Sequence, residues 1–171
     1  FDKPDGTRAI AFGMSAVRNV GEGLVGLMLA ERDENGPFED FFDFCDRVDV
    51  SVLNKRTLES LIKAGGFDSM GYSRKGLLGY FDRIIDDTVA RRRKEAEGQF
   101  DLFSMADDDD DGALVAGTRI VIPEEDFDKR QRLAFEKEML GLYVSDHPLM
   151  GAEASLRRRT ESTIAELEGI E

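Results

Sequence analysis

Two glycines, Gly21 and Gly23, flank Glu22 in the stretch VGEG, between two segments with the apolar spacing of helices. Glycine takes a positive φ at little cost, so we expect this pair to form the tight turn of a helical hairpin. Without side chains, the glycines leave the first backbone N–H groups of the next helix open, and such groups bind anions. Arg18 and Asn19 come directly before the turn. The pattern predicts a site for a DNA phosphate that is blind to base sequence.

A second stretch, LESLIKAGGFDSMGYSRKGLL at 58–78, looks like a degenerate copy of this helix-hairpin-helix pattern. Its candidate phosphate contacts are two turn glycines and the basic residues near them: Gly65, Gly66, Lys55, Arg56, Arg74 and Lys75. The alternative is that both glycine pairs only end helices and allow close packing. Glu22 is itself unfavourable for an anion.

A third stretch, GQFDLFSM at 98–105, places two Phe and a Leu between a charged run and five consecutive aspartates at 107–111. Such flanks belong in water, so we expect Phe100, Leu102 and Phe103 to be exposed for another protein to bury. The alternative is that both Phe residues fold back onto the core of their own chain as the last turn of a helix.

Catalytic chemistry is not expected of these residues. His147 is the one histidine and Cys45 the one cysteine, so neither a zinc site nor a Cys–His pair with a further His to orient it can be assembled. His147 precedes a proline and is expected to order a turn, and Cys45 lies on an apolar stripe and is expected in the core. We expect no catalytic residue, metal site or cofactor, and the aspartate run is interpreted as low complexity.

The composition bounds the class of protein. The chain has 171 residues, 41% of them hydrophobic and 35% charged, with a net charge of −13. This net negative charge argues against a protein that is coated in nucleic acid, although a local basic surface could still bind phosphate. It has no apolar run long enough for a membrane span, so no membrane partner is expected. It shows no signal peptide, and its one cysteine cannot form an internal disulfide, so a reducing, cytoplasmic location is expected. It begins at Phe1, and we interpret it as a piece of a longer protein.

The elements that must position these residues are helices. Apolar periodicity, caps and glycine stops predict an all-α chain with helices at 14–20, 22–32, 38–48, 55–64, 74–97, 127–144 and from 149 on, and a short strand at 119–122. The expected organisation is a tandem helix-hairpin-helix region at 1–97, an exposed peptide with an acidic flexible linker at 98–117, and a helical segment at 118–171. The cluster RRRK at 91–94 is either a solvated helix face or a DNA contact.

The chain resembles the bacterial replicative DNA polymerase III alpha subunits, the family C polymerases, in five stretches that occur in the same order: FGMSAVRNVGEGLV, PFEDFFDFCDRVD, NKRTLESLIKAGGFDSMG, GQFDLF and FEKEMLGLYVSDHPL. The resemblance implies a parent chain that is a DNA-directed DNA polymerase, a nucleotidyltransferase whose catalytic aspartates lie upstream. It also implies an OB-fold after the HPL segment.

The resemblance further implies partners in DNA replication. In the family, QxxLF-type peptides bind the sliding clamp, the beta subunit, and the matching residues here are Gln99, Phe100, Asp101, Leu102 and Phe103. Duplex DNA is the second implied partner, and other replicase subunits would bind through the missing parts. The expected function is therefore non-catalytic binding of clamp and DNA that supports processive replication. An adaptor without DNA binding and a small independent nuclease are the alternatives.

Overall fold

Helices make up all of the regular structure in the part of the chain that the computed structural model describes, which is residues 12–96, 120–160 and 162. The helices are α1 (Glu22–Asn35), α2 (Phe41–Arg47), α3 (Lys55–Ala64), α4 (Arg74–Ala96), α5 (Lys129–Leu140) and α6 (Glu153–Arg157), with short 3-10 turns at Met14–Ala16, Val50–Val52 and Asp68–Met70. The all-α prediction is confirmed. The strand expected at 119–122 is wrong for its described residues, since Ile120 to Ile122 belong to no strand or helix.

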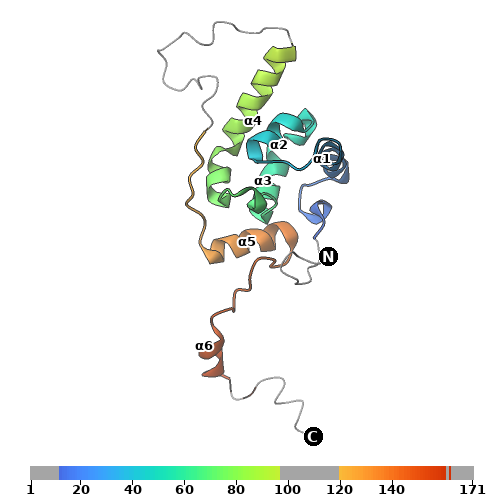
Figure 1. The fold of residues 1–171 in the computed structure, drawn as a ribbon. Helices are drawn as coiled ribbons and strands as arrows, with labels where there is room; N and C mark the ends of the chain where they lie inside the picture. Colours follow the sequence, from blue (N-terminus) through green and yellow to red (C-terminus); the bar gives the residue numbers. More distant parts are fainter. Residues whose placement is uncertain (1–11, 97–119, 161, 163–171) are drawn as a thin grey trace.

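Helix α3 lies at the centre of the fold, with α2 and α4 on one side and α5 across its end (Figure 1). Asn54 caps it as predicted, because its side-chain oxygen accepts a hydrogen bond from the Thr57 backbone N–H at 3.2 Å. Its predicted inner face, Leu58, Leu61 and Ile62, is at most 2% exposed. The hairpin turns therefore pack against this helix.

Helix α4 begins where predicted. The Ser73 hydroxyl accepts a hydrogen bond from the Gly76 backbone N–H at 3.0 Å, and the helix continues to Ala96, the last residue described before 120. Its predicted inner residues pack on the core, fully buried at Leu77, Phe81, Ile84 and Ile85 and partly buried at Leu78 and Val89.

Aromatic rings fill the space between α2 and the end of α3. Phe41 and Phe44 are buried, and both rings lie 5.1 Å from that of Phe67, which packs back on the core as expected. Helix α2 begins later than predicted, because Asp40 accepts from the Asp43 N–H and starts the helix there. Cys45 is fully buried in this cluster, as predicted.

Helix α5 is shorter than predicted. Gly141 takes φ 76° and ends the helix after Leu140, so residues 142–144 lie outside it. Helix α5 packs against α3, and Met139 and Ile122 join the same core. The helix expected from 149 on starts later, at Glu153, and has five residues. None of the helices described is long and apolar enough to cross a bilayer.

Candidate nucleic-acid interface

The first hairpin turn differs from its prediction in which residue bends the chain. The helix expected at 14–20 is only the 3-10 turn Met14–Ala16, and the positive φ falls on Asn19, at 65°. Gly21 is the N-cap of α1 with φ −84° and ψ 147°, a conformation open to any residue. The expectation that Gly21 and Gly23 supply a positive φ is therefore wrong. Asn is one of the few residues that adopt the left-handed region without large cost.

Open space is what the two glycines contribute. A Cβ atom at Gly21 or Gly23 would meet nothing within 4 Å. The Leu24 and Val25 N–H groups donate to the Gly21 carbonyl at 3.1 and 3.2 Å, so the helix ladder begins there. The N–H groups of Glu22 and Gly23, the two residues directly before them, have no partner within the helix. An anion can therefore approach the first turn of α1, although the exposed Glu22 carboxylate opposes it.

Asn19 fixes this turn on α3. The side-chain amide of Asn19 donates to the Ser60 hydroxyl at 3.0 Å, and its backbone carbonyl accepts from the Thr57 hydroxyl at 3.1 Å. Thr57 and Ser60 are each 3% exposed. Asn19 was a candidate phosphate contact, but its amide is engaged with Ser60. We interpret it as the residue that positions the hairpin.

Arg18 and Arg56 flank this docking point. Arg18 directly precedes Asn19, and Arg56 directly precedes Thr57, so the Asn19–Thr57 hydrogen bond brings their backbones together. Both arginines are exposed, and no ion pair joins either to another described side chain. The Arg18 backbone N–H is held by the Met139 carbonyl at 2.9 Å. Arg18 therefore closely precedes the open first turn of α1 in the chain, and the Asn19–Thr57 hydrogen bond brings Arg56 near the same turn.

The second hairpin is built differently. Gly65 takes φ 84°, and a Cβ there would lie 2.2 Å from Arg74 Nη2. Arg74 is only 4% exposed. Its guanidinium donates to the Asp68 carboxylate at 2.7 and 2.9 Å, to Glu136 Oε1 at 3.1 Å and to the Lys63 carbonyl at 3.2 Å. The assignment of Arg74 as a DNA contact is corrected, because its donors are used inside the protein.

The glycines of the second hairpin serve this packing. Gly65 lets the Arg74 side chain pass, and a Cβ at Gly66 would lie 3.2 Å from the Leu61 carbonyl oxygen. Burial alone would lower the pKa of Arg74, but hydrogen bonds and charges from Asp68 and Glu136 outweigh it and raise that pKa above its ordinary value. A DNA contact at Gly65 and Gly66 stays a prediction without support from this geometry.

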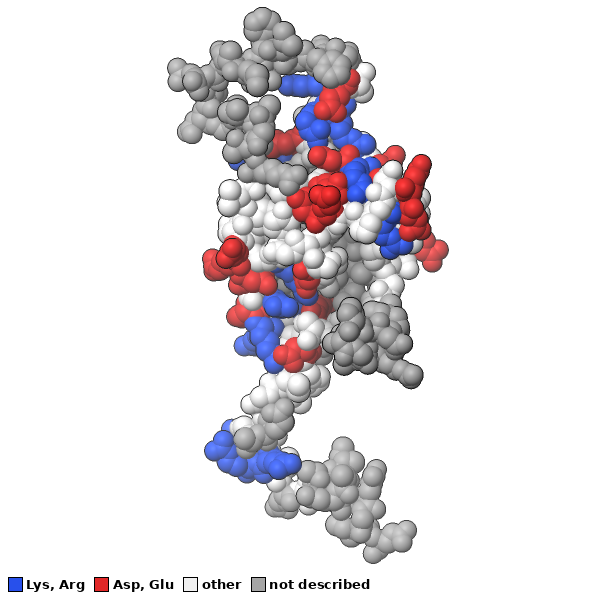
Figure 2. Space-filling view, in the orientation of Figure 1, with Lys and Arg blue, Asp and Glu red and all other residues white. Residues whose placement is uncertain are grey.

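The remaining basic candidates are paired with carboxylates. Lys55 lies 2.8 Å from Asp86 and 3.6 Å from Asp82, and the hydrogen bond to Asp86 raises its pKa. Lys75 forms an ion pair with Glu125. Lys55 and Lys75 also lie near opposite ends of α3. This helix has ten residues and is therefore about 15 Å long. On the face that Figure 2 shows, blue and red side chains are intermixed over the described body, with a largely white area between them. The basic surface expected at 51–75 is therefore largely neutralised.

Two residues of the RRRK cluster at 91–94 make contacts that hold helices together. Arg91 pairs with Asp46, and Arg92 donates to the Val48 carbonyl at 2.7 Å. Both contacts tie the end of α4 to the end of α2. For these two arginines the structure favours a packing role over a DNA contact.

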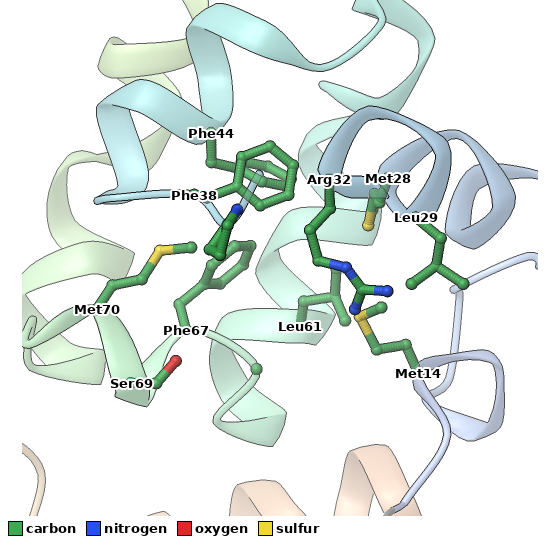
Figure 3. Close-up of a pocket in the computed structure, with 12 residues that line it drawn as sticks. Met14, Met28, Leu29, Arg32, Phe38, Phe44, Leu61, Phe67, Ser69 and Met70 are labelled. Carbon is green, nitrogen blue, oxygen red and sulfur yellow. The ribbon is translucent and has the colours of Figure 1, made fainter. Parts of the chain in front are cut away.

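A pocket of about 310 Å³ opens next to the first hairpin, between α1 and the aromatic cluster (Figure 3). Its walls include three methionines and three phenylalanines: Met14, Met28, Met70, Phe38, Phe44 and Phe67. The Arg32 side chain lies at its edge (Figure 3). The sequence does not reveal this pocket, because its walls come from segments far apart in the chain.

Other singled-out residues have structural roles. The His147 imidazole Nδ1 accepts from the Leu149 N–H at 3.2 Å and orders the turn, as expected. Burial, followed by the charges of Asp46 and Asp40, raises the pKa of Cys45 to about 12. Among the described residues no group of three potential metal ligands occurs. The peptide Gln99–Phe103 and the linker at 98–117 lie outside the described residues.

Known proteins give an independent view of these 171 residues. A family profile described as the helix-hairpin-helix motif matches residues 3–77, which include both hairpins. A protein named DNA polymerase III subunit alpha from Mycobacterium tuberculosis is 44% identical over 155 residues, which is 91% of this chain and 13% of the relative. Subunits with the same name from Saccharopolyspora erythraea and Pseudomonas aeruginosa are 43% and 35% identical over 95% and 92% of this chain, and the chain covers 14% of each.

The chain thus spans about one seventh of the length of these relatives, and the match runs through nearly all of its own residues. The predicted resemblance is confirmed. These 171 residues are homologous to a segment of the bacterial DNA polymerase III alpha subunit and contain its helix-hairpin-helix motif.

Proposed function

We propose that this chain is a non-catalytic part of a replicative alpha subunit and that its first hairpin binds the backbone of duplex DNA. The observation that carries the proposal is the first turn of α1, open at Gly21 and Gly23, with two exposed arginines, Arg18 and Arg56, on either side of the Asn19–Thr57 hydrogen bond that precedes it. Open N–H groups and two guanidinium groups together suit one or two phosphates. The polymerase reaction belongs to other parts of the longer subunit, and a cytoplasmic location follows from a role in replication.

The binding surface in this proposal is smaller than the sequence indicates. It contains Arg18, Gly21, Gly23 and Arg56, with Asn19 holding the turn in place. Lys55 and Lys75 would have to leave their carboxylate partners before they could bind a phosphate. Binding should therefore be weak, blind to sequence and sensitive to salt.

The test is fluorescence anisotropy of labelled duplex DNA titrated with the chain at low salt. Arg18→Ala and Arg56→Ala should each weaken binding severalfold, and the double variant should weaken it further, because each removes one phosphate contact. Arg130→Ala is the matched control, since Arg130 is an exposed arginine on α5, away from the hairpin. If the control weakens binding as much as the hairpin variants, the contact is a general charge effect. No binding by the parent chain would favour the adaptor alternative.

The second part of the proposal is that Gln99–Phe103 binds the sliding clamp. The support is the sequence QFDLF, which matches the family's clamp-binding pattern. It comes shortly after α4 in the sequence. Burying Leu102 and Phe103 would contribute about 1.5–3 kcal/mol each. Ordering a short peptide costs part of this, so a Kd of about 1 μM is expected. A tethered clamp is present at high effective concentration, so even weak binding keeps a polymerase on its template and still allows the polymerase to be released.

Calorimetric titration with the cognate clamp tests the second part. Leu102→Ala with Phe103→Ala should remove most of the binding and leave the melting temperature unchanged. Leu27→Ala is a suitable control, because Leu27 is a 41% exposed leucine on α1. Unchanged clamp affinity in the double variant would reject the anchors. A large fall in melting temperature would show that these two side chains pack inside.

A further inference from the structure

The pocket between α1 and the aromatic cluster has an apolar floor that belongs to the core of the fold. Four of its lining side chains are at most 5% exposed: Met28, Phe44, Leu61 and Phe67. In its wall, the Phe38 ring is held by Arg47, whose guanidinium carbon lies 4.7 Å from the ring centre. The lining residues come from α1 and from the turn of the second hairpin, and they surround one space (Figure 3). A pocket with such fixed walls costs little ordering when a ligand binds.

Aromatic rings and sulfur atoms dominate the wall of this pocket. The Phe44 ring lies 5.1 Å from the rings of Phe38 and Phe67, in edge-to-face contact with each. Three methionines line the same space: Met14, Met28 and Met70. Aromatic rings favour edge-to-face contacts with other rings, and methionine sulfur makes favourable contacts with aromatic rings. The wall therefore suits an aromatic ring better than a straight alkyl chain.

Arg32 brings a positive charge to the mouth of the pocket, where its guanidinium lies near Met14 and Leu29 (Figure 3). Its Nε and Nη2 donate to Asp33 Oδ1 at 3.1 and 2.7 Å. The two side chains of this pair are 49% and 67% exposed, and exposed ion pairs contribute little to stability. A ligand carboxylate can therefore bind the Nη1 group, which Asp33 does not use, or replace Asp33 altogether.

The volume of the pocket limits the size of its ligand. At about 30 Å³ for each water-sized group, a pocket of about 310 Å³ holds about ten nonhydrogen atoms. We propose that this pocket is a binding site for an aryl-alkanoate, which is a phenyl ring joined by a short chain to a carboxylate. The ring would lie between the Phe and Met side chains, and the carboxylate would bind the Arg32 guanidinium at the mouth.

NMR titration of the 171-residue chain with phenylpropionate tests the proposal. Phenylpropionamide has the same shape without the charge, and it should bind about tenfold more weakly, because it loses a hydrogen bond between two charged groups. Octanoate keeps the carboxylate without the ring and should also bind more weakly. The methyl signals of Met14 and Met70 should shift with phenylpropionate, since both side chains line the pocket. No binding of phenylpropionate, or equal affinities for all three compounds, would overturn the proposal.

A pair of arginine variants tests the part played by Arg32. Arg32→Gln should lower the affinity for phenylpropionate to that for the amide and leave the amide affinity and the melting temperature unchanged. Arg83→Gln is the matched control, because Arg83 is an arginine on α4 with a 51% exposed side chain and lies outside the pocket lining. The control should change neither affinity. If the two variants weaken phenylpropionate binding equally, the effect is one of net charge, and the proposed site is wrong.

Discussion

Replacing Glu136 with Gln removes one charge from the buried contact that joins α4, α5 and the segment after α5. The parent carboxylate lies 3.1 Å from the Arg74 guanidinium and accepts two backbone N–H groups. Removing one partner of a buried ion pair costs about 3–5 kcal/mol. Arg74 keeps Asp68, which is partly exposed, so we expect the lower end, about 3 kcal/mol. With about 2–4 °C per kcal/mol, the melting temperature should fall by roughly 6–12 °C.

The pH dependence gives this prediction its specific signature. Burial alone would raise the pKa of Glu136, but hydrogen bonds from Ser145, Val144 and Arg74 outweigh it and lower that pKa below its ordinary value of 4.5. A lowered pKa stabilises the fold above 4.5, and this contribution is lost as the pH falls through the folded-state pKa. The difference in unfolding free energy between the parent and Glu136→Gln should therefore be constant near neutral pH and shrink below about pH 4.5.

Urea unfolding followed by circular dichroism at a series of pH values measures both effects. Glu138→Gln is the matched control, because Glu138 is an exposed glutamate on the same helix. The control should change stability by less than about 0.5 kcal/mol. The account of the buried contact is refuted if both variants lose the same stability, or if the loss at Glu136 stays constant into strongly acidic solution.

Three further outcomes follow from the structure. Gly65→Ala should destabilise more than Gly71→Ala in thermal melts, since both have positive φ but only at Gly65 would the new Cβ meet a guanidinium; equal losses would leave backbone strain as the whole cause. Asn19→Ala should weaken duplex binding and Asn19→Gly less so, because Gly keeps the φ of 65°; the reverse order in anisotropy titrations would show that the turn conformation is not what matters. The Cys45 thiol, with its pKa raised to about 12, should react with Ellman's reagent only as the chain unfolds, and a fast reaction of the folded chain would contradict its burial.

Local sequence was enough to predict the elements whose ends are set by their own neighbours. Asn54 and Ser73 begin helices with side chains that bond within the next three residues, and Gly65 ends one in the left-handed conformation. Helix α5 was predicted too long because its apolar spacing continues past Gly141. The φ of Gly141 ends the helix despite that spacing.

The candidate site was predicted less well, because its chemistry depends on contacts between distant residues. From the sequence, Arg74 is expected to be a free cation, but Glu136, which lies 62 positions away, neutralises it. Lys55 meets Asp86 across the α3–α4 pair in the same way. The docking of Asn19 on Ser60 spans 41 positions. Charge counts over a window cannot detect such partners, so the predicted basic surface was larger than the one that the fold leaves free.

The salt dependence of duplex binding tests the central claim most directly. The affinity of the 171-residue chain for a duplex of arbitrary sequence would be measured over a range of salt concentrations. Each neutralised phosphate contributes about −0.9 to the slope of log affinity against log salt, so the contacts of Arg18 and Arg56 predict a slope of about −2. Arg18→Ala should bring it to about −1. A slope near zero, or a slope that Arg18→Ala with Arg56→Ala leaves unchanged, would contradict the assignment of the first hairpin as the DNA contact.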